Sequence, residues 1–192
     1  MRRAYLLLLP MLLGAGCSFL KPSVDPTTYY VLTATATTAA PNPQPRVVGV
    51  EPVHLPEYLD RPQLVTRIGP NQLRISDIER WAEPLGDALT STLRQDVAAA
   101  LPDAMVVVQP DVSQHVDAQI VVEVMRFERV ADNAVELAVR WKLRDGSGNV
   151  QLAKDARIRQ ATTDAKAPAA VAALSQALAT LAAELAAAIG RQ

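Results

Sequence analysis

The predicted elements of this chain are arranged around residues 55–85, LPEYLDRPQLVTRIGPNQLRISDIERWAEPL. This stretch contains a Tyr-Leu-Asp-Arg-Pro turn at 58–62 and an Arg-Trp-Ala-Glu-Pro-Leu segment at 80–85. Between them, two runs rich in apolar and β-branched residues flank Gly69-Pro70-Asn71, in which proline presets φ and asparagine tolerates a positive φ. The pattern predicts a β-hairpin between the two motifs.

In the segment at 80–85, the candidate structural residues are Arg80, Trp81 and Pro84. Ser76 and Glu79 have the spacing of a capping box, which predicts a short helical turn carrying Arg80 and Trp81. An exposed tryptophan beside an arginine could contact a partner, whereas a buried one serves packing. We favour packing for Trp81.

Two helices are predicted from apolar residues at three- and four-residue spacing. The first begins at Pro84 and ends before Pro102. The second covers residues 168–189, where leucines share one face and alanine fills most of the rest, so that the helix can lie flat on a sheet. A coiled-coil seam is the alternative, but the run has fewer than four heptads and no paired charge positions.

Strands are predicted on both sides of the first helix. Residues 29–34 and 46–53 precede it, and a short buried strand at 105–108 follows it. Between residues 118 and 162, apolar and polar residues alternate in three long runs, which predicts an antiparallel meander. The expected fold class is α+β, with a mainly antiparallel mixed sheet and two amphipathic helices packed on one face.

The N-terminal residues predict export followed by lipidation. Met1-Arg2-Arg3 is a basic start, and residues 4–13 form an apolar run of secretory length that is too short to span a bilayer. Small residues then precede Cys17, the single cysteine of the chain, which resembles a bacterial lipobox. Gly14 departs from that pattern, because leucine is usual there. We expect a diacylglyceryl group on the thiol of Cys17.

These motifs divide the chain into three expected parts. Residues 1–16 are a lipoprotein signal peptide, 17–28 are the lipidated cysteine and a flexible tether, and 29–192 form a single α+β domain. An ordinary signal peptide is the alternative, but it would leave a free thiol in an exported protein. Ser18 follows the cysteine instead of Asp, which in enteric-type sorting resembles a lipoprotein of the outer membrane.

Composition argues against several classes of function. The formal net charge is −1, and removal of Arg2 and Arg3 leaves 17 basic against 20 acidic residues, so there is no basic footprint for nucleic acid. The two histidines, His54 and His115, lie far apart, and with Cys17 acylated no metal site is predicted. No nucleophile elbow or phosphate loop is present. We therefore expect no catalytic residue, no cofactor and no enzymatic activity.

Three segments in a fixed order carry a family resemblance: 29–32 soon after the lipidated cysteine, then 55–65 and 80–85. Together they resemble the PqiC-type family of ABC-transport auxiliary lipoproteins. The resemblance implies a periplasmic lipoprotein, anchored in the outer membrane, that works with an MCE-domain protein of an ABC-type transporter in moving lipids across the envelope. Homo-oligomerisation around a ring-shaped partner is compatible with it, although the sequence carries no direct sign of that assembly.

The turn at 58–62 supplies the candidate partner contacts Tyr58, Leu59 and Arg61. The following proline pushes Arg61 towards an extended conformation, which is expected to present all three side chains outward on a stiff turn. An aromatic residue with an arginine is a composition that interface hot spots favour. The alternative is that Tyr58 packs in the core and that Arg61 and Arg80 form ion pairs with nearby carboxylates. Those carboxylates are Asp60, Asp77 and Glu83.

The expected function is that of a non-enzymatic adaptor between the outer membrane and the MCE-domain partner. The alternative from another class is a lipid-binding carrier, in which the sheet and the final helix enclose an apolar pocket. An envelope hydrolase is a weaker third possibility, because histidine is scarce and no activated nucleophile is evident.

Overall fold

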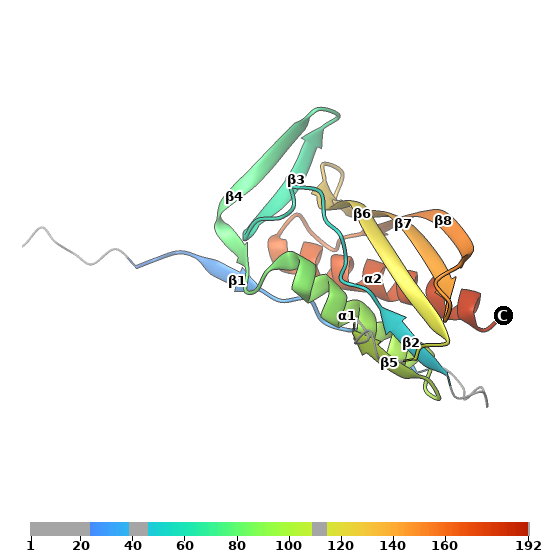
Figure 1. The fold of residues 1–192 in the computed structure, drawn as a ribbon. Helices are drawn as coiled ribbons and strands as arrows, with labels where there is room; N and C mark the ends of the chain where they lie inside the picture. The colour runs from blue at the N-terminus through green and yellow to red at the C-terminus, as the bar shows by residue number, and fades with distance from the viewer. Residues whose placement is uncertain (1–23, 39–45, 109–114, 192) are drawn as a thin grey trace, which may run out of the picture.

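The structure, a computed structural model, describes residues 24–38, 46–108 and 115–191, in which eight strands and two helices form one mixed sheet and its helical cover (Figure 1). The predicted signal peptide and Cys17 lie outside the described residues. The elements are β1 (Thr28–Tyr30), β2 (Val47–Val50), β3 (Gln63–Gly69), β4 (Gln72–Trp81), α1 (Leu85–Ala100), β5 (Met105–Val108), β6 (Ala118–Val130), β7 (Ala134–Asp145), β8 (Val150–Ala161) and α2 (Ala167–Ile189).

The sheet is forked at β6. One edge of β6 pairs with β7, which pairs in turn with β8, and both pairings are antiparallel. The other edge pairs in parallel with β2 near its start and with β3 near its end. Two arms therefore leave this edge, one made of β2 and β5 and the other of β3, β4 and β1. The chain crosses from the first arm to the second through residues 51–62.

The α+β class and the mixed sheet are confirmed. Antiparallel pairing joins the longest strands, β6, β7 and β8, and the hairpin of β3 and β4. Four shorter pairings are parallel. They join β2 and β3 to β6, β5 to β2, and β1 to β4. The two tight turns of the meander include the positive-φ residues Asn133 (φ 51°) and Gly148 (φ 85°). Both residue types tolerate this conformation.

The two helices occupy the same face of the sheet, with α2 along β6, β7 and β8 and α1 beside α2 and β5 (Figure 1). The apolar face predicted for β7 is confirmed, but its polar face is buried in part, because Glu136 is only 4% exposed. Five apolar positions on the face towards the helices are almost completely buried. These residues are Val135, Leu137, Val139, Trp141 and Leu143, none more than 1% exposed. Within the described residues, α2 is the one helix with the length and hydropathy of a membrane span, but 61% of that apolar window is buried. Packing on the sheet accounts for this composition.

The strand expected over residues 29–34 is shorter than predicted. Pairing with β4 ends at Tyr30, and the chain then lies against the helices. There the backbone N–H groups of Thr35 and Ala36 both donate to the same oxygen of Asp96 on α1, each at 2.8 Å. Backbone groups that a strand would direct to a neighbouring strand are thus satisfied by a helix side chain.

The strand at 105–108 is present but is not buried as predicted. Met105 is 61% exposed and Val108 is 43% exposed. The reason is its position, since β5 is the outer strand of its arm and pairs with β2.

The helical turn predicted at Ser76 is wrong, because β4 continues to Trp81. The local hydrogen bond of the motif nevertheless forms, with the N–H of Glu79 donating to the Ser76 hydroxyl at 3.0 Å. Opposite this segment the register shifts, from Val65 with Ile75 to Gln63 with Arg80. The residues between form a bulge in the strand, so pairing with β3 overrides the local helical preference.

Removal of the Asp96 carboxylate should destabilise the protein. Asp96 is fully buried, and Asp96→Ala would leave the N–H groups of Thr35 and Ala36 without an acceptor. We expect a loss of about 1–3 kcal/mol in the free energy of unfolding, measured by urea denaturation. Ser91→Ala, at an exposed position on the same helix, is the control. An equal loss in both variants would contradict the role of the carboxylate.

The same residue makes a prediction about pH. Burial raises the pKa of Asp96 above its ordinary value of 3.8, against the two backbone hydrogen bonds that lower it. A raised pKa in the folded state means that protonation favours folding, and this contribution is lost as the pH rises through the raised pKa. The stability of the wild type relative to Asp96→Asn should therefore fall as the pH rises above about 4. A difference that rises with pH over this range would refute the assignment.

Candidate functional site

The turn at 55–62 lies in the fork of the sheet. Its own backbone is hydrogen-bonded, with the N–H of Leu59 donating to Pro56 at 2.9 Å and that of Arg61 to Leu59 at 2.8 Å. Before the turn, His54 bridges to β6, donating its N–H to Val122 at 3.1 Å and accepting that of Val124 at 2.8 Å. The turn is therefore fixed to the edge of β6 between the two arms.

The outward orientation predicted for Leu59 is wrong. Its side chain is 2% exposed and lines a small cavity together with Trp81 and Phe127. The fork leaves apolar space below the turn, and the leucine fills it. Packing of Trp81 is confirmed, because it is 6% exposed and its ring centroid lies 6.2 Å from that of Phe127.

Tyr58 is half-buried and has a defined hydrogen-bond partner. Its hydroxyl donates to the carbonyl of Met125 at 3.1 Å. Met125 lies where the register of β6 against β7 shifts, and the extra residue of a bulge has no partner on the neighbouring strand. Burial, with a smaller contribution from the charge of Glu128, raises the pKa of Tyr58 to about 12. The phenol therefore stays protonated and remains a donor.

The two arginines of the sequence motifs do not form the ion pairs considered above. Across the described ranges, neither Arg61 nor Arg80 has a carboxylate oxygen within 4 Å of its guanidinium. The Nε atoms of both are buried without a hydrogen-bond partner. Both side chains are partly exposed, so part of each guanidinium reaches solvent.

A cluster of charges that sequence reasoning missed lies on the other face of the sheet, beside Tyr58. Glu128 and Glu136 stand directly opposite each other on β6 and β7 and are only 1% and 4% exposed. Glu128 accepts a short hydrogen bond from Arg67 of the hairpin. Glu136 binds Arg126 and Arg157, each at 2.9 Å. We call these five side chains the glutamate–arginine cluster.

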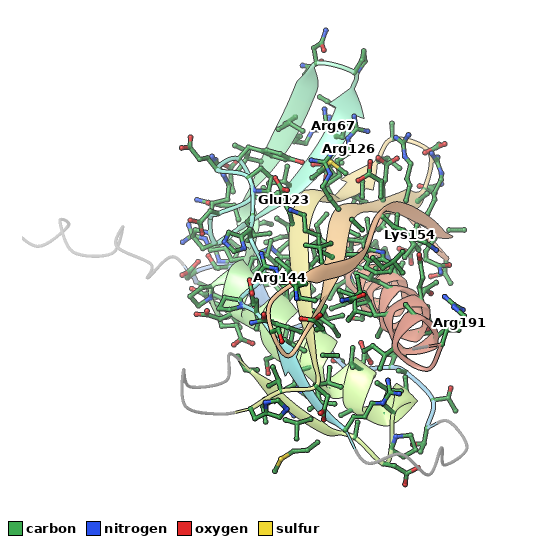
Figure 2. The ribbon with its side chains drawn as sticks, turned by 45° about the vertical axis from the view of Figure 1, so that its right-hand side comes forward. Arg67, Glu123, Arg126, Arg144, Lys154 and Arg191 are labelled. Carbon is green, nitrogen blue, oxygen red and sulfur yellow. The ribbon has the colours of Figure 1, made fainter. Side chains whose placement is uncertain are left out.

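The arginines make two opposed, buried carboxylates tolerable. Like charges directly across an antiparallel pair destabilise a sheet, and a buried carboxylate needs a paired cation. Burial raises the pKa of Glu136, but its bonds to Arg157 and Arg126 outweigh burial and leave the pKa below its ordinary value. Figure 2 shows Arg67 and Arg126 near each other where the hairpin meets β6, whose end pairs with Thr66 and Arg67.

An open groove of about 470 Å³ lies between the base of the hairpin and the first turn of α2. It is lined by Tyr30, Thr66, Arg74, Ser76, Glu79, Arg129, Ala165, Lys166, Ala167 and Pro168. An adjoining cavity of about 20 Å³ shares Thr66, Glu79, Arg129 and Ala167 with the groove. Residues of the stretch 55–85 thus line both the groove and the cavity. Its partners on β6 and α2 are distant in sequence, so spacing alone could not reveal them.

A family model described as an ABC-type transport auxiliary lipoprotein component matches residues 30–186. The chain belongs to this family. The resemblance carried by residues 29–32, 55–65 and 80–85 is confirmed. The family describes an auxiliary component of transport, which agrees with the expectation that the protein is not an enzyme. Among the described residues, no three His, Cys, Asp or Glu side chains are grouped as metal ligands.

Two solved structures share the fold. An uncharacterised protein is 26% identical, with a TM-score of 0.72 over 85% of this chain and 98% of its own. A protein from Xanthomonas campestris is 22% identical, with a TM-score of 0.69 over 82% of this chain and 92% of its own. No curated protein matches this sequence. The family and the fold are thus established.

The Arg67–Glu128 pair makes a prediction about stability. Arg67→Ala leaves Glu128 buried beside Glu136 without its cation, and we expect a loss of about 3 kcal/mol in the free energy of unfolding. The double variant Arg67→Ala/Glu128→Ala should lose less than the sum of the single variants. Arg140→Ala removes an exposed partner of Asp155 and should cost less than about 1 kcal/mol. Additive losses in the double-mutant cycle, measured by urea denaturation, would show that the pair is not coupled.

Proposed function

We propose that this family member is a non-enzymatic adaptor that acyl chains on Cys17 anchor in the outer membrane. It docks onto the MCE-domain protein of an ABC-type lipid transporter and helps to maintain the cell envelope. The observation that carries the proposal is the close packing, among the described residues, between the sheet and α2. The cavity beside the first turns of α2 measures about 20 Å³, enough for about one water molecule. An acyl chain needs far more space, which favours the adaptor over the carrier.

Dense packing along α2 supports this choice. Its leucines and final isoleucine face the sheet and are between 0 and 3% exposed. These residues are Leu174, Leu178, Leu181, Leu185 and Ile189. An adaptor acts through its surface, so a solid core suits it, whereas a carrier must keep internal space open for its cargo.

The proposed docking surface is the β3–β4 hairpin, which projects from the rest of the sheet in Figure 1. Ile75 and Ile78 on β4 are 44% and 46% exposed. Tyr58 and Arg61 lie in the turn at its base and are partly exposed. Exposed apolar residues, an aromatic residue and an arginine on one projecting element and the turn before it have the composition of a protein interface. The ion pair of Arg67 with Glu128 ties the hairpin to β6, so this surface is held in position.

Site-specific photo-crosslinking in intact cells tests the docking surface. A photoreactive amino acid at Ile78 or Arg61 should capture the MCE-domain protein. The same residue at Gln176, which is exposed on α2, is the matched control and should capture little of it. Equal capture from Gln176, or capture of nothing but membrane components from the hairpin, would overturn docking through this surface.

Anchoring is tested separately. The chain carrying Cys17→Ala behind a signal peptide cleaved by the ordinary signal peptidase should appear in the soluble periplasmic fraction, because several acyl chains are what hold the protein at the membrane. The unaltered lipoprotein should sediment with outer membranes. Replacement of Ser18 by Asp should move it to the inner membrane in an enteric host. A Cys17→Ala protein that still sediments with membranes after signal cleavage would disprove acyl anchoring.

A further inference from the structure

We infer that the groove between the hairpin base and α2 is a binding site for a phosphate ester. The source of the phosphate is either the headgroup of a phospholipid or a free phosphate compound. This inference assigns a ligand to the protein itself and does not depend on the proposed docking through the hairpin.

Three cations from three separate elements line the groove. Arg74 comes from β4, Arg129 from the end of β6, and Lys166 from the residue preceding α2. Within the described ranges, none of the three forms an ion pair. In contrast, each arginine of the glutamate–arginine cluster has a carboxylate partner. Unpaired cations that converge on a concave surface concentrate positive potential there.

The single carboxylate in the lining is that of Glu79, so the lining has a formal charge of +2. Glu79 donates its backbone N–H to Ser76 but has no cationic partner among the described side chains. Its carboxylate therefore opposes an anion in the groove. This opposition predicts that an uncharged replacement of Glu79 tightens binding.

The chemistry of the lining suits phosphate. A guanidinium group offers a planar fork of donors that matches two oxygens of a phosphate, and two arginines are present. Tyr30, Thr66 and Ser76 also line the groove, and each carries a hydroxyl that can donate a hydrogen bond to an oxygen. Burial and the nearby charge of Glu79 raise the pKa of Tyr30, which keeps this phenol protonated and able to donate.

The size of the groove indicates an ester of phosphate. Its volume of about 470 Å³ lies within the range of small-molecule sites, roughly 300–1,000 Å³, and exceeds the need of a single phosphate ion. The adjoining cavity, at about 20 Å³, cannot take an acyl chain. A phospholipid would therefore place its headgroup in the groove and keep its chains outside.

Calorimetric titration of the full-length processed lipoprotein in a non-ionic detergent tests the inference. The probes, in phosphate-free buffer of low ionic strength, are inorganic phosphate, glycerol 3-phosphate and dihexanoyl phosphatidylglycerol, with dihexanoylglycerol as the uncharged control. We expect saturable binding of the phosphate compounds and none of dihexanoylglycerol. Tightest binding of the phosphatidylglycerol identifies a headgroup site, and comparable binding of glycerol 3-phosphate identifies a site for free phosphate esters.

Matched variants locate the binding. Arg74→Gln and Arg129→Gln should each weaken binding about tenfold or more, and Glu79→Gln should strengthen it. Arg191→Gln removes the same charge from an exposed position beyond the last turn of α2 and should leave affinity unchanged (Figure 2). Since α2 has 23 residues, Arg191 lies about 35 Å from its first turn. Because Arg74 is exposed, its variant should fold even if Arg129→Gln does not.

Three results would overturn the inference. The first is the absence of saturable binding of every phosphate compound to the wild type. The second is an equal loss of affinity in Arg74→Gln and Arg191→Gln, which would mean attraction by overall charge alone. The third is tighter binding of a triglutamate peptide than of any phosphate compound, which would assign the groove to an acidic protein segment.

Discussion

The rest of the structure depends on which groups form hydrogen bonds with the backbone of β6 along the edge between the two arms. β2 pairs with its first residues and β3 with its last, so the middle of this edge has no neighbouring strand. His54 bonds to Val122 and Val124 on β6, and the hydroxyl of Tyr58 bonds to Met125. Buried backbone groups need such partners, and an unpaired one costs as much as a lost hydrogen bond. The turn at 55–62 is thus a structural replacement for a missing strand.

The glutamate–arginine cluster adds a second constraint on the same strand. A slip of one residue between β6 and β7 would turn Glu128 from the charged face of the sheet into the apolar face beneath α2. Buried ion pairs add little net stability, but a misplaced one is costly. We therefore interpret the cluster as a device that fixes the register of β6 and, through Arg67, the attachment of the hairpin. This interpretation explains why such polar residues lie at positions with 1% and 4% exposure.

The elements that the sequence predicted well are those whose evidence is local. Alternation in β7 and leucine spacing in α2 each repeat over many residues, so tertiary context had little room to override them. Single-residue inferences were weaker. The turn conformation predicted that the Leu59 side chain would point outward. The side chain instead points into the apolar interior between the two arms, where it is buried. The Ser76 hydroxyl accepts the hydrogen bond expected of a helix cap, from the N–H of Glu79. The backbone is nevertheless extended there, because β4 pairs with β3.

Features formed by several distant elements were beyond the reach of the sequence. The alternating pattern placed Glu136 on the polar face of its strand, but nothing in the spacing showed that Arg126 and Arg157 would bury it. The groove is a similar case, because Arg74, Arg129 and Lys166 belong to separate periodic segments. The sequence predicts each of these segments separately. It does not predict that they lie side by side, because the tertiary fold of the forked sheet brings them together.

The path of the chain before the fold connects the proposed anchor with the groove and the hairpin. β1 pairs with the last residues of β4, and Tyr30 at its end lines the groove. Tyr30 follows Cys17 by thirteen residues, which can span at most about 45 Å when fully extended. An acyl group on Cys17 would therefore keep the groove within that distance of the bilayer surface, where phospholipid headgroups are concentrated. The same short connection would hold the hairpin near the membrane, because β1 enters the fold at its base. The proposed headgroup site and the proposed docking surface both adjoin the strands that β1 enters, which would suit a membrane-anchored auxiliary component of transport.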